Sequence, residues 1–108
     1  MGKHDPISIT VGPLTYKQVS DVLDTLREAD AAAYRVAMAG LVPQTRKILK
    51  MRADLKQHPT RPNVALTLGI TIDAVERAEV KGLAALYVLW SEASGRQVVV
   101  SKKLVKEG

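Results

Sequence analysis

The sequence predicts a mainly α-helical domain: three to four helices in a small bundle, with a short two-stranded β element formed by the N- and C-terminal segments. Apolar residues recur at intervals of three and four along most of the chain, as in amphipathic helices. Two β-rich runs, ISITV at 7–11 and QVVV at 97–100, lie near opposite ends. The 108 residues, 46% of them hydrophobic, suffice for one core. We therefore treat 1–108 as a single domain, with 1–6 and 102–108 as flexible tails.

A strand and a long helix are predicted in the N-terminal part. ISITV alternates apolar and hydroxyl side chains, as a half-buried strand does, and the Gly-Pro pair that follows ends it. Thr15 and Gln18 have the spacing of a capping box, which satisfies backbone N–H groups of the first helical turn. Because the apolar stripe continues without interruption and Gly40 suits a C-terminal stop, we predict one helix over 15–39.

Two shorter helices are expected next. Pro43 suits the first turn of the second helix, and a His-Pro pair closes that helix. Leu55 belongs to its narrow apolar stripe, while cations crowd the rest of its surface. Pro62 then allows at most a short helix, over 63–68.

The last helix is predicted from Thr71, its cap, to about Ala93. Asp73 is well placed against the positive end of its dipole. Gly82 interrupts it at a cost of about 1 kcal/mol relative to alanine, which we attribute to close contact with another helix. QVVV then pairs with ISITV. The face of this last helix that we expect to point inward consists of Ile72, Val75, Glu79, Leu83, Leu86 and Trp90.

Composition excludes several classes of site. The absence of cysteine excludes disulfides and thiolate metal sites. No apolar run is long enough to cross a membrane, and the N-terminus lacks the apolar stretch of a signal peptide. We therefore expect a cytoplasmic protein with no membrane association.

Signatures of catalysis are missing. His4 and His58 have no carboxylate or nucleophile at a useful spacing, and no glycine-rich phosphate loop appears. Two acidic pairs at i,i+3 are more typical of solvated helix faces than of metal sites. These pairs are Asp21 with Asp24 and Glu76 with Glu79. We predict a protein that is not an enzyme, with no catalytic residue, cofactor, metal or small-molecule substrate.

The net charge of +5 is segregated along the chain: residues 46–61 carry +5, the tail from Arg96 carries +3, and the rest carries −3. A cationic helix can neutralise phosphates, and it can equally be a solubilising surface or a contact with an acidic protein. No interleaved aromatic residue offers a platform for base stacking. Nucleic acid and acidic protein both remain open as partners. The candidate anion-binding residues are Arg46, Lys47, Lys50, Arg52, Lys56 and Arg61.

Residues 61–80 have the spacing of a DNA-binding helix-turn-helix, with a turn at Gly69. The second helix, however, begins with three acidic residues against Arg77 and Lys81. A helix in a phosphate-lined groove usually presents basic or amide side chains. We therefore favour a packed helical corner, in which the apolar residues of this stretch fill the core.

The last helix is apolar over most of its C-terminal half. This apolar surface exceeds what the neighbouring helices of a small three-helix monomer would cover. We predict that the surplus is buried in self-association or in a contact with a partner. The candidate partner-binding residues are Val80, Ala84, Tyr87, Val88 and Trp90.

The overall layout resembles the small tail assembly chaperones of long-tailed bacteriophages. Three segments carry the resemblance: ITVGPLTYKQVSDVLDTL, the spacer with a basic middle, and LGITIDAVERAEVKGLAALYVLWSEASGR. Membership implies binding to the tape-measure protein or to tail-tube subunits before the tail is built, in the host cytoplasm or in the virion. It implies no catalytic or ligand residue. The strongly basic charge departs from the family.

We therefore expect an interaction protein, a phage tail assembly chaperone or assembly factor that also forms a homo-oligomer. Two alternatives remain: a helix-turn-helix DNA-binding protein that uses 61–80, and a small virion structural protein.

Overall fold

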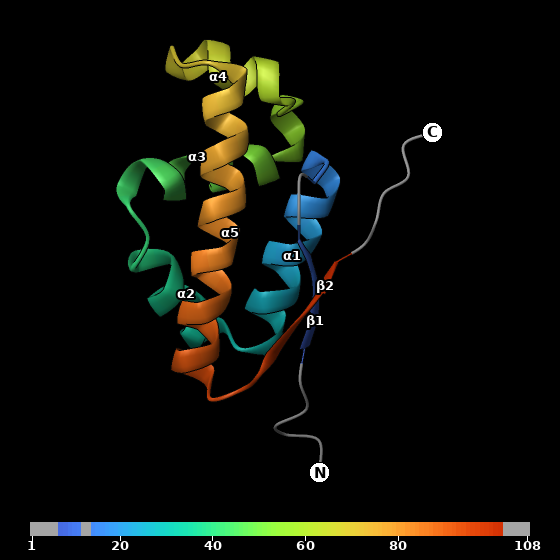
Figure 1. Ribbon diagram of the computed structural model, residues 1–108, viewed down its shortest axis with the longest axis vertical. Coiled ribbons are helices and arrows are strands. Elements are labelled where there is room, and N and C mark those ends of the chain that lie inside the picture. Colours follow the sequence, from blue (N-terminus) through green and yellow to red (C-terminus); the bar gives the residue numbers. More distant parts are fainter. Residues whose placement is uncertain (1–6, 12–13, 103–108) are drawn as a thin grey trace.

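Helices make up most of the computed structural model, which describes residues 7–11 and 14–102 (Figure 1). This confirms the prediction of a mainly α-helical chain. The elements are β1 (Ile7–Val11), α1 (Tyr16–Ala29), α2 (Ala31–Ala39), α3 (Pro43–Ala53), the 3-10 turn η2 (Leu55–Gln57), α4 (Arg61–Leu68), α5 (Ile72–Ser94) and β2 (Val98–Lys102). The Gly12-Pro13 break and the predicted tails lie outside the described residues, except Lys102, which belongs to β2.

The single helix predicted over 15–39 is wrong, because the chain breaks at Asp30 into α1 and α2. Asp30 is extended, with φ −161° and ψ 95°. Its backbone N–H donates to the carbonyl of Leu26 at 3.1 Å, and its side chain accepts from the N–H of Ala33 at 3.0 Å. One residue thus caps the end of one helix and the start of the next. With this break, the described residues form five α-helices instead of three to four.

The capping box that opens α1 is confirmed. The N–H of Gln18 donates to the hydroxyl of Thr15 at 3.2 Å, and the N–H of Thr15 donates to the side-chain oxygen of Gln18 at 2.9 Å. These reciprocal bonds explain why α1 begins at Tyr16.

The basic helix is shorter than the sequence suggests. α3 ends at Ala53, and the side chain of Asp54 accepts from the N–H of Lys56 to start the 3-10 turn η2. The helical phase is lost at this point. Leu55, expected to face the core, is therefore 48% exposed.

The two strands run in parallel, with Ile7 beside Val98 and Val11 beside Lys102. The N–H of Ile7 donates to the carbonyl of Gln97 at 3.0 Å, which fixes the start of the register. Residues from the two ends of the described chain thus lie side by side (Figure 1).

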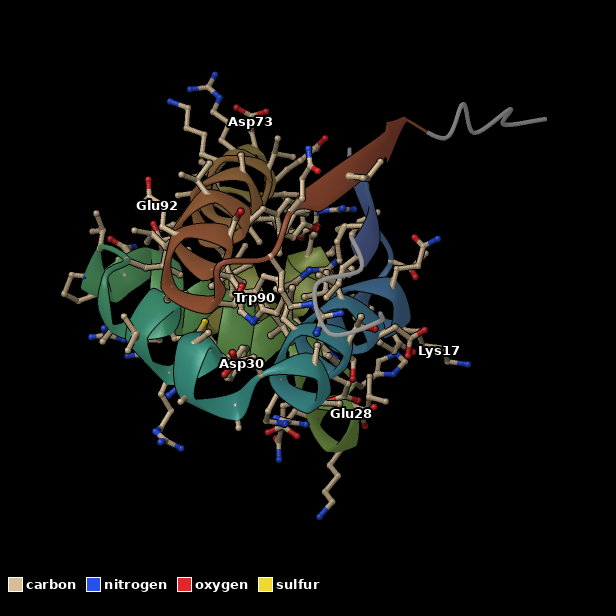
Figure 2. All side chains as sticks on the ribbon, turned by 90° about the horizontal axis from the view of Figure 1, so that it is seen from below. Lys17, Glu28, Asp30, Asp73, Trp90 and Glu92 are labelled. Carbon is tan, nitrogen blue, oxygen red and sulfur yellow. The ribbon has the colours of Figure 1, made fainter. Side chains whose placement is uncertain are left out.

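Helix α5 runs along the length of the molecule and contacts α2, α3 and α4 (Figure 1). The main core lies between α5, α1, α2 and the strands. Trp90 is fully buried there and points inward from α5, with its indole N–H donating to the carbonyl of Leu26 at 3.0 Å (Figure 2). A smaller cluster fills the corner of α3, α4 and α5. Its buried members are Ile48, Val64, Ala65 and Val75.

The interpretation of Gly82 as a site of close helix contact is confirmed. A Cβ atom at this position would lie 2.4 Å from Cγ2 of Thr45 and 3.4 Å from Cδ1 of Leu49. The backbone of α5 therefore approaches α3 too closely for any larger residue without movement.

Within residues 7–11 and 14–102, no helix has the length and apolar character needed to span a membrane.

Candidate protein-binding site

The five candidate partner-binding residues of α5 divide into two groups. Tyr87 and Trp90 lie in the core, so they must be removed from any exposed binding surface. Val80 and Val88 are 37% and 57% exposed, and Ala84 is exposed between them. The sequence could not separate the groups, because α5 is apolar around most of its circumference and only its neighbours decide which face is covered.

Ala84 and Val88 line an open groove of about 560 Å³ between α5 and β2. The other lining residues are Tyr87, Ser91, Glu92, Gln97 and Val98. Most of the surface lining this groove is apolar. The volume falls in the range of protein clefts that bind ligands.

Tyr87 lies at the edge of this groove with its ring in the core. Burial raises the pKa of its hydroxyl well above the ordinary value, and the negative charge of Glu79 raises it further. The hydroxyl therefore stays neutral at physiological pH, so this wall of the groove adds no charge.

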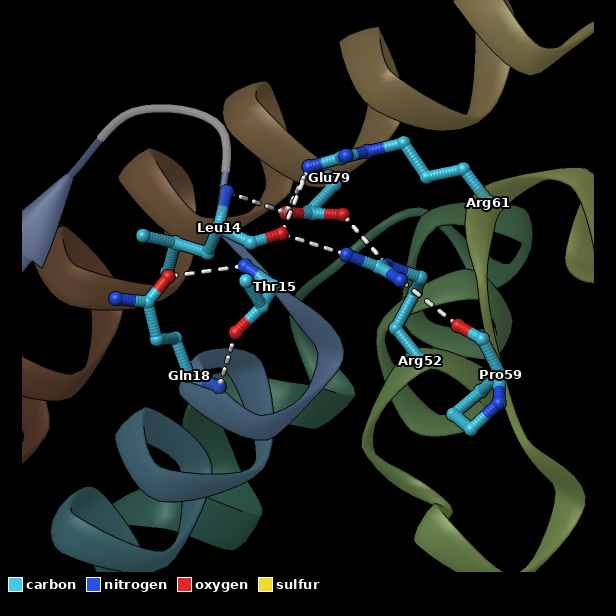
Figure 3. Close-up of polar contacts among 7 residues, drawn as sticks. All are labelled: Leu14, Thr15, Gln18, Arg52, Pro59, Arg61 and Glu79. Carbon is cyan, nitrogen blue, oxygen red and sulfur yellow. Dashed lines mark hydrogen bonds and ion pairs between the residues drawn. The ribbon is translucent and has the colours of Figure 1, made fainter. Parts of the chain in front are cut away.

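A buried ionic cluster lies between α5, α3 and the start of α4 (Figure 3). Nε of Arg52 donates to Oε1 of Glu79 at 2.8 Å, and Nη2 of Arg61 lies 3.4 Å from Oε2 of Glu79. The backbone N–H of Leu14 also donates to Oε2, at 3.4 Å. The carboxylate is thus held by two cations and one amide.

The guanidinium groups are further held by backbone carbonyls. Arg52 donates to the carbonyl of Leu14 at 2.6 Å and to that of Pro59 at 2.7 Å. Arg61 donates to the same Leu14 carbonyl at 2.8 Å. These bonds connect the chain before α1 with α3, α4 and α5 (Figure 3). The cluster therefore has a structural role, because both oxygens of its carboxylate are bonded to groups of the same chain.

Two sequence-based interpretations are corrected by this cluster. Arg52 is buried and Arg61 is directed at Glu79, so neither forms an exposed anion-binding face. Glu79 is fully buried and does not belong to a solvated acidic pair with Glu76. The signal was present in the sequence, since Glu79 continues the inward stripe of Val75. A carboxylate in such a stripe requires a buried cation.

Three of the remaining candidate cations, Arg46, Lys47 and Lys50, line one open hollow of about 410 Å³ on α3, together with Pro43, Met51 and Asp54. Arg46 donates to the carbonyls of Met38 and Ala39 at the C-terminal end of α2, at 3.3 and 3.4 Å. Lys47, Lys50 and Lys56 are exposed, with Asp54 exposed among them. This open surface, which also contains the carboxylate of Asp54, offers long-range attraction to anions.

The helical corner predicted in residues 61–80 is confirmed. Gly69 adopts φ +70° at the end of α4, and the N–H of Ile70 donates to the carbonyl of Ala65 at 3.0 Å. On the exposed start of α5, Arg77 forms an ion pair with Asp73 at 3.0 Å. Ile72, expected to face inward, is half exposed. The helix that would enter a DNA groove thus carries a carboxylate beside its first cation.

No residue cluster within the described part of the chain has the composition of a metal site. His58 packs edge-on against the ring of Tyr16, with 5.8 Å between centroids.

No family model, curated protein or solved structure matches the chain.

Proposed function

We propose that this protein is a non-enzymatic interaction protein that binds a segment of a tail or virion protein in the groove between α5 and β2. The role that fits best is a phage tail assembly chaperone or assembly factor, whose partner is a tape-measure or tail-tube protein in the host cytoplasm. The layout of the strand, the capped helix α1 and the long helix α5 supports this role.

The observation that carries the proposal is the exposed row of Val80, Ala84 and Val88 beside the groove. Valine side chains on the surface of a long helix leave apolar area exposed to water, and the neighbouring groove makes this exposed area concave. An amphipathic or extended segment of another protein would cover it. We expect the bound segment to present apolar side chains to Ala84 and Val88.

Co-expression with a tape-measure or tail-tube protein encoded beside this chain tests the proposal. We expect the two proteins to copurify, and Val88→Asp to reduce capture at least about tenfold because a carboxylate would be desolvated in the contact. Leu66→Asp is the matched control, since Leu66 is 82% exposed on α4 and lies outside the groove. Equal capture by both variants would contradict the proposal.

A helix-turn-helix DNA-binding protein is the alternative that one observation favours, the α4–Gly69–α5 corner. Titration of duplex DNA over a salt series separates it from the first proposal. A specific complex that is lost in the Arg77→Ala and Lys81→Ala variants would favour DNA binding. Weak binding that moderate salt abolishes would leave the exposed lysines of α3 as a nonspecific surface.

The third candidate, a small virion structural protein, differs from an assembly factor in where the chain ends up. Mass spectrometry of purified particles would detect a structural protein in stoichiometric amount. An assembly chaperone would be depleted from them.

A further inference from the structure

The outer face of α5 combines the row Val80, Ala84 and Val88 with charges on one flank. The row spans about 12 Å of helix, since each residue advances the axis by about 1.5 Å. Lys81 and Glu92 are both exposed and lie about 20° apart around the helix axis, on the same side of the row. Figure 2 shows Asp73 and Glu92 pointing away from the core on this outer face, opposite to Trp90.

We propose that a second copy of this chain packs on this face, with the two α5 helices antiparallel about a twofold axis. The face is self-complementary in that orientation. When Ala84 lies opposite Val88 of the second copy, Val88 lies opposite Ala84 of the second copy. The small side chain of Ala84 leaves room for the valine, so the two axes approach closely.

Charge complementarity selects this register. Because the helices run in opposite directions, the position three residues before Ala84 on one helix faces the position three residues after Val88 on the other. Lys81 therefore lies opposite Ser91 of the second copy and next to its Glu92. The twofold axis repeats the Lys81–Glu92 contact, which gives two ion pairs per dimer.

A parallel pair would have the opposite electrostatics. It would place Lys81 against Lys81 and Glu92 against Glu92, and like charges at such positions disfavour association. The two most exposed apolar side chains of the other helices, Leu66 on α4 and Val36 on α2, do not belong to this row.

The dimer itself goes beyond the proposed function, but one of its consequences rests on that function. Ala84 and Val88 belong both to the dimer contact and to the groove. A client segment and the second copy therefore compete, so the dimer keeps Ala84 and Val88 covered until a client displaces it. The contact is short, and we expect it to belong to the weak, reversible class of interfaces.

Sedimentation velocity of the full chain over a dilution series tests the dimer. We expect dimers at high concentration, and a dissociation constant raised roughly tenfold by either Lys81→Glu or Glu92→Lys. The double reversal, Lys81→Glu with Glu92→Lys, restores the pairing and returns the constant to near the wild-type value. Lys50→Glu and Glu28→Lys make the same charge changes at exposed sites outside this face, so they should leave it unchanged.

Oxidative crosslinking provides a second measurement, because the chain contains no cysteine. A mixture of Ala84→Cys and Val88→Cys chains should form mixed disulfide dimers in excess over either homodimer. A wild-type monomer at every concentration would overturn the proposal, as would a double reversal no better than the single ones. Failure of the proposed function is distinct: the dimer would form and respond to these changes, while no tail protein competes with it.

Discussion

Arg52 and Glu79 form an ion pair of 2.8 Å from which water is almost completely excluded. Removing both charges from water is unfavourable, and their attraction offsets this only because the remaining donors and acceptors are also bonded. The backbone carbonyls of Leu14 and Pro59 accept the other hydrogen bonds of the Arg52 guanidinium. Arg61 and the N–H of Leu14 are the other partners of the Glu79 carboxylate. The pair therefore couples α3 to α5 and fixes the entry into α1.

Breaking this pair from one side should be strongly destabilising. We expect Arg52→Met to lower the free energy of unfolding by about 3–5 kcal/mol, because Glu79 would keep a buried charge with only Arg61 as a cationic partner. Urea denaturation followed by circular dichroism measures this. Lys50→Met is the matched control, since Lys50 is exposed on the same helix. We expect it to change stability by less than about 0.5 kcal/mol.

Removing both partners distinguishes pairing from packing. The double variant Arg52→Met with Glu79→Leu should lose less stability than the sum of the two single variants, because it leaves no unpaired charge. Strict additivity would show that Arg52 and Glu79 act independently.

The contact at Gly82 makes a prediction with a built-in rescue. Gly82→Ala should destabilise by about 1–3 kcal/mol, because its Cβ would meet Cγ2 of Thr45. Thr45→Ser removes that methyl group, and in this background we expect Gly82→Ala to be neutral or stabilising. Ala85→Gly, at an exposed position of the same helix, gives the intrinsic glycine penalty as a reference. A Gly82→Ala effect that does not depend on residue 45 would contradict the close contact.

Trp90 provides a direct test of the core, since it is the only tryptophan in the chain. Its emission should be blue-shifted and poorly quenched by iodide, because the ring is fully buried. Trp90→Phe should cost about 2–4 kcal/mol, since it leaves a cavity and removes the donor to the Leu26 carbonyl. Strong quenching in the folded protein would instead return Trp90 to the exposed surface.

The raised pKa of Tyr87 predicts a loss of stability in alkali. The folded chain retains this proton at a pH where the unfolded chain, with an ordinary pKa of 10.0, releases it. The unfolded state therefore binds fewer protons above pH 10.0, and stability falls as pH rises there by at most about 1.4 kcal/mol per pH unit. Below that pH this group contributes no slope.

Thermal unfolding across this alkaline range checks the prediction. Tyr87→Phe should have a shallower pH dependence than the wild type, although its stability at neutral pH is altered by the missing hydroxyl. Tyr16→Phe, on the partly exposed side of α1, is the matched control. Identical slopes for Tyr87→Phe and the wild type would contradict the assignment.

Local rules were sufficient to predict much of the secondary structure from the amino-acid sequence. The capping box of Thr15 and Gln18, the turn at Gly69 and the last helix from Ile72 all depend on residues close together in the chain. The break at Asp30 was missed because the apolar period continues through it. Only the cap bonds to Leu26 and Ala33 show that one aspartate ends one helix and starts another.

The candidate binding surface was predicted only in part, for a physical reason. By itself, the sequence determined that α5 carries more apolar surface than one face of a helix needs. The tertiary structure decided which of those residues remain exposed: α1 and α2 cover Trp90, whereas Val88 is left at the surface. The tertiary structure also decided that Arg52 is buried and paired with Glu79. The sequence alone does not distinguish a helical cation that contacts water from one that contacts a buried carboxylate. Burial and charge pairing depend on residues distant in the chain, and those meet only in the folded protein.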